Sequence, residues 1–168
     1  IGGAHKAHVD IITPKMVRVI IGVDDTDTKE VGSTWSTVLK MGSTCPVGRF
    51  IDHKIIQLNP KVPAKTTNCC STAVSIAVRE QEIPDLIDHC RRYLKEHTYS
   101  DGTVMTVYNG LRVTDALQEY GLRAKTEILE VADATRVAGE NGVQVISITG
   151  TDGVIGAVAA IGCFDMGG

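Results

Sequence analysis

Hydrophobic and polar residues alternate along the chain in short blocks that predict strands and helices in turn. Residues 16–23, MVRVIIGV, are rich in β-branched side chains, as a buried strand requires. Residues 84–97 instead repeat apolar side chains at helical spacing, and Pro84 suits the first turn of a helix. The chain therefore contains both kinds of element.

The remaining segments follow the same two periods. Strands are predicted over residues 53–58, 72–78, 103–107, 126–131 and 143–148, and helices over residues 33–40, 113–120, 132–140 and 154–161. We expect Gly42 with Pro46 to end the helix at residues 33–40, and Gly121 to end the helix at residues 113–120. This alternation, without internal repeats, predicts an α/β or α+β fold with helices packed on a mixed sheet.

The length of 168 residues suits one domain with a hydrophobic core. We expect an arm or linker over residues 1–15 and a single nucleotide-binding domain over residues 16–168. The chain does not begin with Met and shows no secretory signal, so we expect a cytoplasmic fragment of a longer protein. The longest apolar run, residues 154–162, is too short to cross a bilayer.

Charge and aromatic content bear on the partners. The net charge is −3, and the aromatic residues are two Phe, one Trp and four Tyr. Nucleic-acid-binding proteins usually carry a basic face and aromatic stacking platforms, so we do not expect nucleic acid as a partner of this chain alone. A neighbouring domain of the same polypeptide or a second copy in a homodimer remains open.

The five cysteines include no C-x-x-C pair, so we expect reduced thiols. Cys69 and Cys70 are adjacent and could ligate a soft metal, but no third and fourth ligand stands at a suitable spacing. A thiol-dependent role for this pair is an alternative.

Three carboxylates, Asp24, Asp25 and Asp27, follow directly after the first strand. Loops after strands point into the crevice where ligands bind in α/β proteins. Such crowded carboxylates repel one another unless a cation neutralises them, and hard oxygen ligands favour Mg²⁺. The alternative is a solvated turn whose aspartates cap the next helix.

A second motif carries Gly150, Gly153 and Gly156 between the last strand and the last helix. Backbone N–H groups in this context cradle phosphate, although Asp152 would oppose an anion unless a metal lay between them. No Walker A lysine follows. The alternative is a small-residue helix that packs closely on a sheet.

A third motif, residues 59–68, combines prolines with donors for phosphate oxygens from Asn59, Lys65 and Asn68. Taken alone, this motif is better explained as a rigid surface connection with solvated lysines. Together, the acidic loop, the glycine turn and the lysine loop are the parts that phosphoryl transfer needs, so we expect ATP and Mg as cofactors. Asp25 and Thr34 are the candidate catalytic residues, Thr34 as phosphoryl acceptor or only as a helix cap.

Three stretches resemble the kinase domain of archaeal tRNA-isoleucine agmatinylcytidine synthetase. They are residues 22–27 (GVDDTD), 58–66 (LNPKVPAKT) and 153–162 (GVIGAVAAIG). Residues 24–30, 34–35 and 52–78 also resemble an uncharacterised family, the eleventh of the methanogenesis marker proteins.

The resemblance implies a domain that uses ATP and a divalent metal to activate a carbonyl or hydroxyl by phosphorylation, within a methanogen-specific modification pathway. It implies that Asp24, Asp25 and Asp27 hold Mg²⁺ against the ATP phosphates and that Gly153 and Gly156 line the nucleotide pocket. Thr34 falls where the synthetases have an autophosphorylated threonine.

The chain also departs from that pattern. The synthetases have an arginine and glycines after their Lys-Thr pair, where this chain has Thr67, Asn68, Cys69 and Cys70. An arginine would neutralise transition-state charge. Its replacement favours the alternative of a non-catalytic nucleotide- and metal-binding regulatory module of a larger protein.

Overall fold

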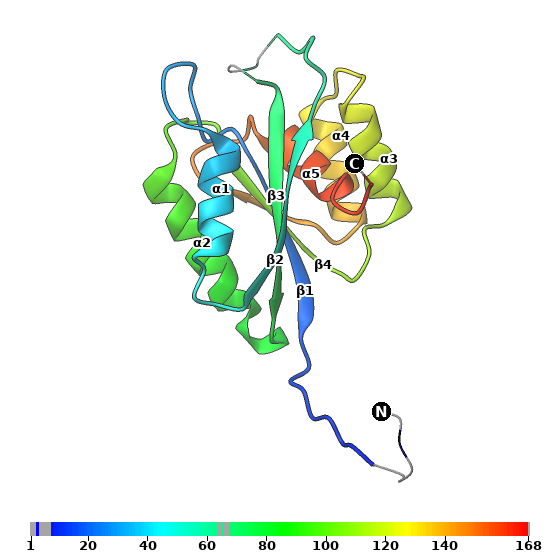
Figure 1. Ribbon diagram of the computed structural model, residues 1–168. Coiled ribbons are helices and arrows are strands. Elements are labelled where there is room, and N and C mark those ends of the chain that lie inside the picture. Colours follow the sequence, from blue (N-terminus) through cyan, green and yellow to red (C-terminus); the bar gives the residue numbers. More distant parts are fainter. Residues whose placement is uncertain (1–2, 4–7, 64, 66–67, 168) are drawn as a thin grey trace.

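The computed structural model describes residues 3, 8–63, 65 and 68–167 (Figure 1). Its strands are β1 (Val17–Asp24), β2 (Arg49–Gln57), β3 (Cys70–Val78), β4 (Val104–Asn109) and β5 (Gln144–Ser147). Its helices are α1 (Thr34–Ser43), α2 (Ile83–His97), α3 (Asp115–Ala124), α4 (Val131–Glu140) and α5 (Val154–Gly162), with a 3-10 turn at Glu80–Glu82.

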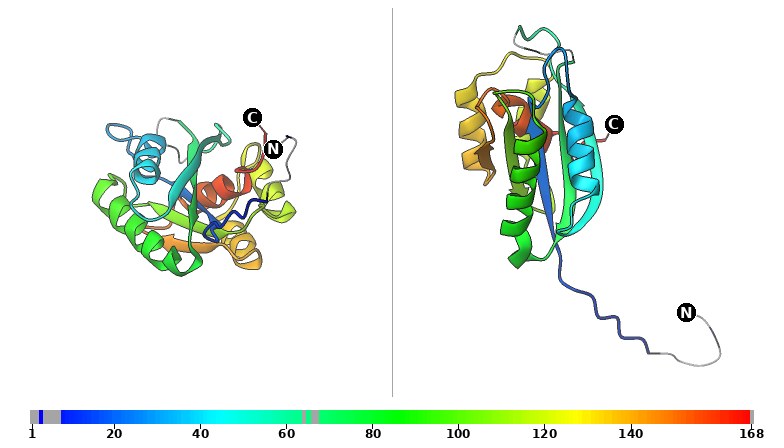
Figure 2. Two further views of the ribbon diagram at one scale, coloured as in Figure 1. Left: turned by 60° about the horizontal axis from the view of Figure 1, so that its bottom comes forward. Right: turned by 90° about the vertical axis from the view of Figure 1, so that its left-hand side faces the viewer.

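The strands form one sheet in the order β2-β3-β1-β4-β5, so that β1 lies at its centre. All four pairings are antiparallel. Helices α1 and α2 cover one face of this sheet, and α3, α4 and α5 lie on the other, so the molecule has three layers (Figure 2).

Side chains of β1 alternate between the two halves of the core, as the period of a strand requires. Val19, Ile21 and Val23 pack beneath α1 and α2, whereas Ile20 packs with α5. Gly22 lets α5 approach β1, because a Cβ there would overlap the carbonyl of Ala157. The acidic loop that follows β1 is thereby brought beside the start of α5.

The sequence-based fold class is confirmed, with one refinement in the sheet. The chain is an α+β protein with helices packed on a sheet, but the sheet is antiparallel throughout rather than mixed. All predicted helices and strands occur within a few residues of their expected positions, except the strand at 126–131.

That predicted strand was wrong. Residues 126–130 form a loop, and Val131 begins α4. Among the apolar residues of this segment only Leu129 is buried, whereas Ile128 is 66% exposed. The alternation needed to cover a sheet face is therefore missing.

The helix end expected at Gly121 was also wrong, because Gly121 lies inside α3. The end expected from Gly42 and Pro46 is confirmed, since α1 ends at Ser43, between these two residues. A Cβ on Gly42 would lie 2.9 Å from Cγ1 of Val74, and one on Gly121 would lie 2.8 Å from Sγ of Cys163. Both glycines allow close packing of their helices on neighbouring elements.

Outside the sheet and helices, residues 8–15 of the expected arm form no helix or strand, and residues 1–2 and 4–7 lie outside the described part. No helix among the described residues is long and apolar enough to span a membrane. All five cysteines are free thiols.

Candidate functional site

The chain bends sharply where β1 ends. Asp25 adopts a φ of 61°, a left-handed conformation that Asp tolerates better than most residues. Its backbone N–H donates a hydrogen bond of 2.9 Å to Oδ1 of Asp24. This bend directs two successive carboxylates toward the same side of the sheet.

The glycine turn packs directly on this bend. A Cβ on Gly153 would lie 2.7 Å from the carbonyl oxygen of Asp24 and 3.2 Å from Cβ of Asp25. A Cβ on Gly156 would overlap Oδ2 of Asp24. The acidic loop and the glycine turn, more than a hundred residues apart in the sequence, therefore build one wall. They can approach this closely because the two glycines have no Cβ.

This wall borders a cavity of about 480 Å³. Seven of the residues singled out from the sequence line it: Asp24, Asp25, Asp27, Lys65, Asn68, Gly153 and Gly156. Cys69, Cys70 and Asp152, which the sequence analysis also considered, line it too. Residues that the sequence analysis did not consider for the site complete it: Leu58, Val62, Ala124, Glu127, Ile128, Leu129, Val131 and Ile155. The cavity combines an acidic wall with an apolar one, as is typical of small-molecule sites.

The carboxylates of the acidic wall oppose one another's ionisation. Burial raises the pKa of Asp24 to about 8, and the charges of Asp25 and Asp27 add to that effect. Burial likewise raises the pKa of Asp25, together with the charges of Asp152 and Asp27. A cation among these groups would favour their ionised forms.

The carboxylates of the acidic wall are suitable ligands for Mg²⁺, judged by how this ion is usually coordinated. Within the described part of the chain, no three His, Cys, Asp or Glu side chains converge as a ready ligand cluster. Mg²⁺ is commonly held by one or two carboxylates, with water and substrate phosphates in its other positions. Asp24, Asp25 and Asp27 can supply those carboxylates.

Thr34 lies beside the acidic loop, at the start of α1, and is buried. Its hydroxyl donates to Oδ1 of Asp27 at 2.9 Å and accepts a hydrogen bond of 3.2 Å from the backbone N–H of Thr26. The residue that precedes the helix is Ser33. The Thr34 side chain thus positions Asp27 rather than capping the helix, and it lines a second hollow of about 340 Å³ that adjoins the first at Asp27, Asn68 and Cys70.

The predicted phosphate-binding loop divides into cavity-lining and structural residues. Lys65 lines the cavity, although its Nζ donates to the carbonyl of Pro60 at 2.6 Å. Asn59 is buried, and its Oδ1 accepts a hydrogen bond of 3.0 Å from the backbone of Lys61. Gly150 packs on the backbone of Asp101, so neither Asn59 nor Gly150 lines the cavity. Thr66 and Thr67 lie outside the described residues.

Cys69 and Cys70 also line the cavity. Burial raises the pKa of both thiols, and the nearby charge of Asp24 acts in the same direction. Sγ of Cys70 donates to Oε1 of Gln57 at 3.2 Å. Thiols held in the protonated form are poor ligands for a soft metal.

The apolar wall is the part that sequence reasoning missed. Its residues come from the β2–β3 connection, the end of α3, the following loop and α5. Single apolar residues on separate elements have no spacing signal. Among the carboxylates of the cavity, Asp152 was already noted in the glycine turn, whereas Glu127 was missed, although a carboxylate in an exposed loop could have been singled out.

Comparison with known proteins gives this geometry a context. Residues 20–82 match the family described as the TiaS TCKD domain. The TiaS of Thermococcus sibiricus, a tRNA 2-agmatinylcytidine synthetase, is 30% identical over 152 residues, which are 88% of this chain and 35% of that protein. The chain is homologous to TiaS. The resemblance to the agmatinylcytidine synthetases inferred from the sequence is therefore confirmed.

Two further relatives extend the comparison. An uncharacterized protein of Methanocaldococcus jannaschii is 42% identical over 164 residues, 96% of this chain and 55% of that protein. The TiaS of Archaeoglobus fulgidus is 28% identical over 152 residues, 87% of this chain and 36% of that enzyme. The chain thus spans about half of the first relative and about a third of TiaS.

Solved structures of TiaS share the fold. The crystal structure of TiaS with tRNA and ATP matches with a TM-score of 0.79 and 24% identity, over 87% of this chain and 36% of that chain. A complex of TiaS with tRNA, AMPCPP and agmatine matches with a TM-score of 0.76 and 23% identity, over the same shares. These likenesses support the architecture described above.

Proposed function

We propose that this chain is an ATP-using domain of a tRNA-modifying type of enzyme. It binds ATP with Mg²⁺ in the larger cavity and activates a carbonyl or hydroxyl of its acceptor by phosphorylation. The observation that carries the proposal is the packing of Gly153 and Gly156 on Asp24 and Asp25, which joins the acidic loop and the glycine turn in one wall. The homology to TiaS, which has been crystallised with ATP, supports the same ligand.

The residues divide the work by their chemistry. One or two of Asp24, Asp25 and Asp27 would hold the metal, and Lys65 and Asn68 lie where they can donate to phosphate oxygens. Bound Mg²⁺ would neutralise charge that develops on the transferred phosphoryl group. Thr34 orients Asp27 by its hydrogen bond, which suits a positioning residue. The apolar wall excludes water from one side of the site.

The acceptor and the partners follow from the homology as proposals. TiaS has been crystallised with tRNA, and with AMPCPP and agmatine. Nucleic acid is therefore a proposed partner of the longer protein, which revises our expectation from charge and aromatic content. A methanogen-specific modification pathway remains the proposed setting.

One observation favours a second candidate, a regulatory module that binds nucleotide without turnover. Among the described residues that line the cavity, Lys65 is the single cation, and its Nζ donates to the carbonyl of Pro60. Phosphoryl transfer usually relies on further positive charge near the transferred group. Binding without ATP consumption, in the 168-residue chain and in the longer protein alike, would favour this candidate.

The first experiment is a calorimetric titration of the chain with ATP, in Mg²⁺ and then in EDTA. We expect saturable binding that disappears when the metal is removed. Asp25→Asn should abolish this binding and leave the melting temperature close to that of the wild type, because Asn tolerates the left-handed backbone at this position.

Asp88→Asn is the matched control, since Asp88 pairs with Arg91 and Arg92 on the exposed face of α2. This variant should bind as the wild type does. Absence of ATP binding to the wild type in either condition would contradict the proposal. A large loss of stability in Asp25→Asn would assign Asp25 a structural role instead.

A further inference from the structure

The apolar wall of the cavity contains one carboxylate, Glu127. It enters from the loop between α3 and α4, together with Ile128 and Leu129, whereas the aspartates come from the β1 loop and the turn before α5. The Glu127 side chain is 49% exposed, while Leu129 is only 9% exposed. Glu127 therefore stands at the mouth of the cavity and not in its interior.

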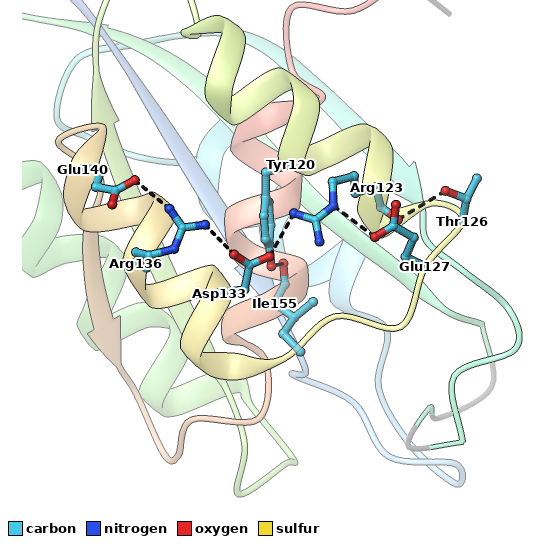
Figure 3. A network of polar contacts seen from close by, with 8 residues as sticks. All are labelled: Tyr120, Arg123, Thr126, Glu127, Asp133, Arg136, Glu140 and Ile155. Atoms are coloured by element: carbon cyan, nitrogen blue, oxygen red, sulfur yellow. Dashed lines mark hydrogen bonds and ion pairs between the residues drawn. The ribbon is translucent and has the colours of Figure 1, made fainter.

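A chain of ion pairs fixes the side chain of Glu127 (Figure 3). Nε of Arg123 donates to Oε2 of Glu127 at 3.0 Å, and the Glu127 backbone N–H donates to the carbonyl of Arg123 at 2.7 Å. The same guanidinium donates to Oδ2 of Asp133 on α4 at 3.0 Å. Arg123 thus bridges Glu127 and Asp133, and the Glu127 carboxylate that it holds can accept further hydrogen bonds.

The network continues away from the cavity. Arg136 donates to Oδ1 of Asp133 at 2.6 Å and to Oε2 of Glu140 at 2.8 Å. Glu140 is 60% exposed and does not line the cavity. One network therefore ends in a glutamate on both sides: Glu127 at the cavity and Glu140 on the outer surface.

The chemistry of a carboxylate limits what Glu127 can bind. An ionised carboxylate only accepts hydrogen bonds, and it repels phosphate oxygens. The apolar side chains beside it suit the flat face of a base. In a nucleotide, the sugar lies between base and phosphates and presents hydroxyl donors, and an acidic side chain is a known partner of the ribose 2′-hydroxyl in other nucleotide sites.

We infer that Glu127 is a specificity residue that accepts a hydrogen bond from the ribose 2′-hydroxyl of the nucleotide, with Arg123 as its positioning residue. The inference rests on the proposed nucleotide site. It assigns the sugar to the cavity mouth and the base to the apolar wall. The pocket then selects ribonucleotides over 2′-deoxyribonucleotides.

The test compares three ligands by calorimetry with Mg²⁺ present: ATP, 2′-deoxy-ATP and inosine triphosphate. The wild type should bind ATP about tenfold or more tightly than 2′-deoxy-ATP, as expected for a lost hydrogen bond to a charged group. Glu127→Ala should bind these two ligands almost equally. Glu140→Ala makes the same change at the far end of the network and should keep the wild-type preference.

Each contrary outcome has its own meaning. Equal binding of ATP and 2′-deoxy-ATP by the wild type, or an unchanged preference in Glu127→Ala, overturns the inference and leaves the proposed function standing. The inference also fails if Glu127→Ala loses discrimination against inosine triphosphate instead, because Glu127 would then contact the base. Absence of any ATP binding to the wild type overturns the proposed function together with this inference.

Discussion

Gly156 lies against the carboxyl group of Asp24 so closely that a Cβ at position 156 would overlap Oδ2. The two residues stand at the start of α5 and at the end of β1, in adjacent layers of the molecule. Because β1 is the central strand, the contact couples the geometry of the acidic loop to the seating of α5. Glycine at position 156 is therefore a condition for placing Asp24 in the cavity wall.

The first prediction concerns Gly156→Ala. In an exposed helix Ala is favoured over Gly by about 1 kcal/mol, but here the added methyl group must displace the Asp24 carboxyl or α5. We expect the free energy of unfolding to fall and the affinity for ATP with Mg²⁺ to fall at least about tenfold. Thermal unfolding and calorimetric titration measure the two effects.

Gly139→Ala is the matched control for this substitution. Gly139 lies in α4, and a Cβ there would meet no atom within 4 Å. It should retain wild-type ATP binding and gain up to about 1 kcal/mol of stability. Wild-type affinity in Gly156→Ala would show that Asp24 takes no part in the site.

The second prediction concerns Thr34. Its buried hydroxyl donates to Asp27 and accepts from Thr26, so Thr34→Ala should lower stability by about 1–2 kcal/mol and weaken ATP binding through the released Asp27. Thr34→Ser keeps the hydroxyl and should recover most of both losses. Denaturant unfolding and calorimetry separate these variants.

The same contacts make Thr34 a poor phosphoryl acceptor in the folded chain, because its hydroxyl is already engaged by Asp27 and by the backbone of Thr26. We expect the intact mass of the wild type to stay unchanged after incubation with ATP and Mg²⁺. A gain of one phosphate that Thr34→Ala does not show would contradict this positioning role and restore the expectation drawn from the synthetases.

The sequence predicted the site's polar half better than its apolar half. Asp24, Asp25 and Asp27 are neighbours in the sequence, and so are the glycines of the turn, so each group can be recognised as a motif from its spacing. Leu58 and Ile155 reach the cavity only because β2, α3 and α5 meet there, and that meeting depends on strand order. Periodicity carries no information on strand order, which is why the second wall could not be foreseen.

The fold shows the same division between local and long-range causes. Helix α2 and strand β1 were predictable because a single face or a dense β-branched run specifies each. The strand expected at residues 126–131 failed because Ile128 is exposed and lines the cavity, so it does not pack on the sheet. A three-residue apolar pattern does not distinguish residues that pack on a sheet from residues that line a cavity.

The third prediction concerns the pH dependence of stability through Asp165. Burial alone would raise its pKa, but hydrogen bonds from Arg18 and from the Val113 N–H, with the charges of Arg18 and Lys54, hold the pKa below its usual value. A carboxyl group with a depressed pKa stabilises the fold above about pH 4, where it is ionised. This stabilisation is lost as the pH falls through the folded-state pKa and the group becomes protonated.

Asp165→Asn should therefore destabilise the protein by about 2 kcal/mol near pH 7, and the difference from the wild type should shrink below about pH 4. Denaturant unfolding at several pH values measures the difference. Asp88→Asn, which removes an exposed ion-pair partner, should leave stability close to that of the wild type. A deficit of Asp165→Asn that is constant down to pH 3 would assign the effect to lost packing rather than to charge.

The fourth prediction concerns Gly121, which lies inside α3 where that helix crosses α5. A Cβ at this position would lie 2.8 Å from Sγ of Cys163 and 3.1 Å from the carbonyl carbon of Gly162, so the helices would have to separate. Gly121→Ala should therefore lower stability by about 1–3 kcal/mol, although Gly139→Ala raises it, as thermal unfolding can show. Because α5 also carries Gly156, the same variant should weaken ATP binding. Stabilisation by Gly121→Ala would mean that this helix crossing does not hold α5 in place.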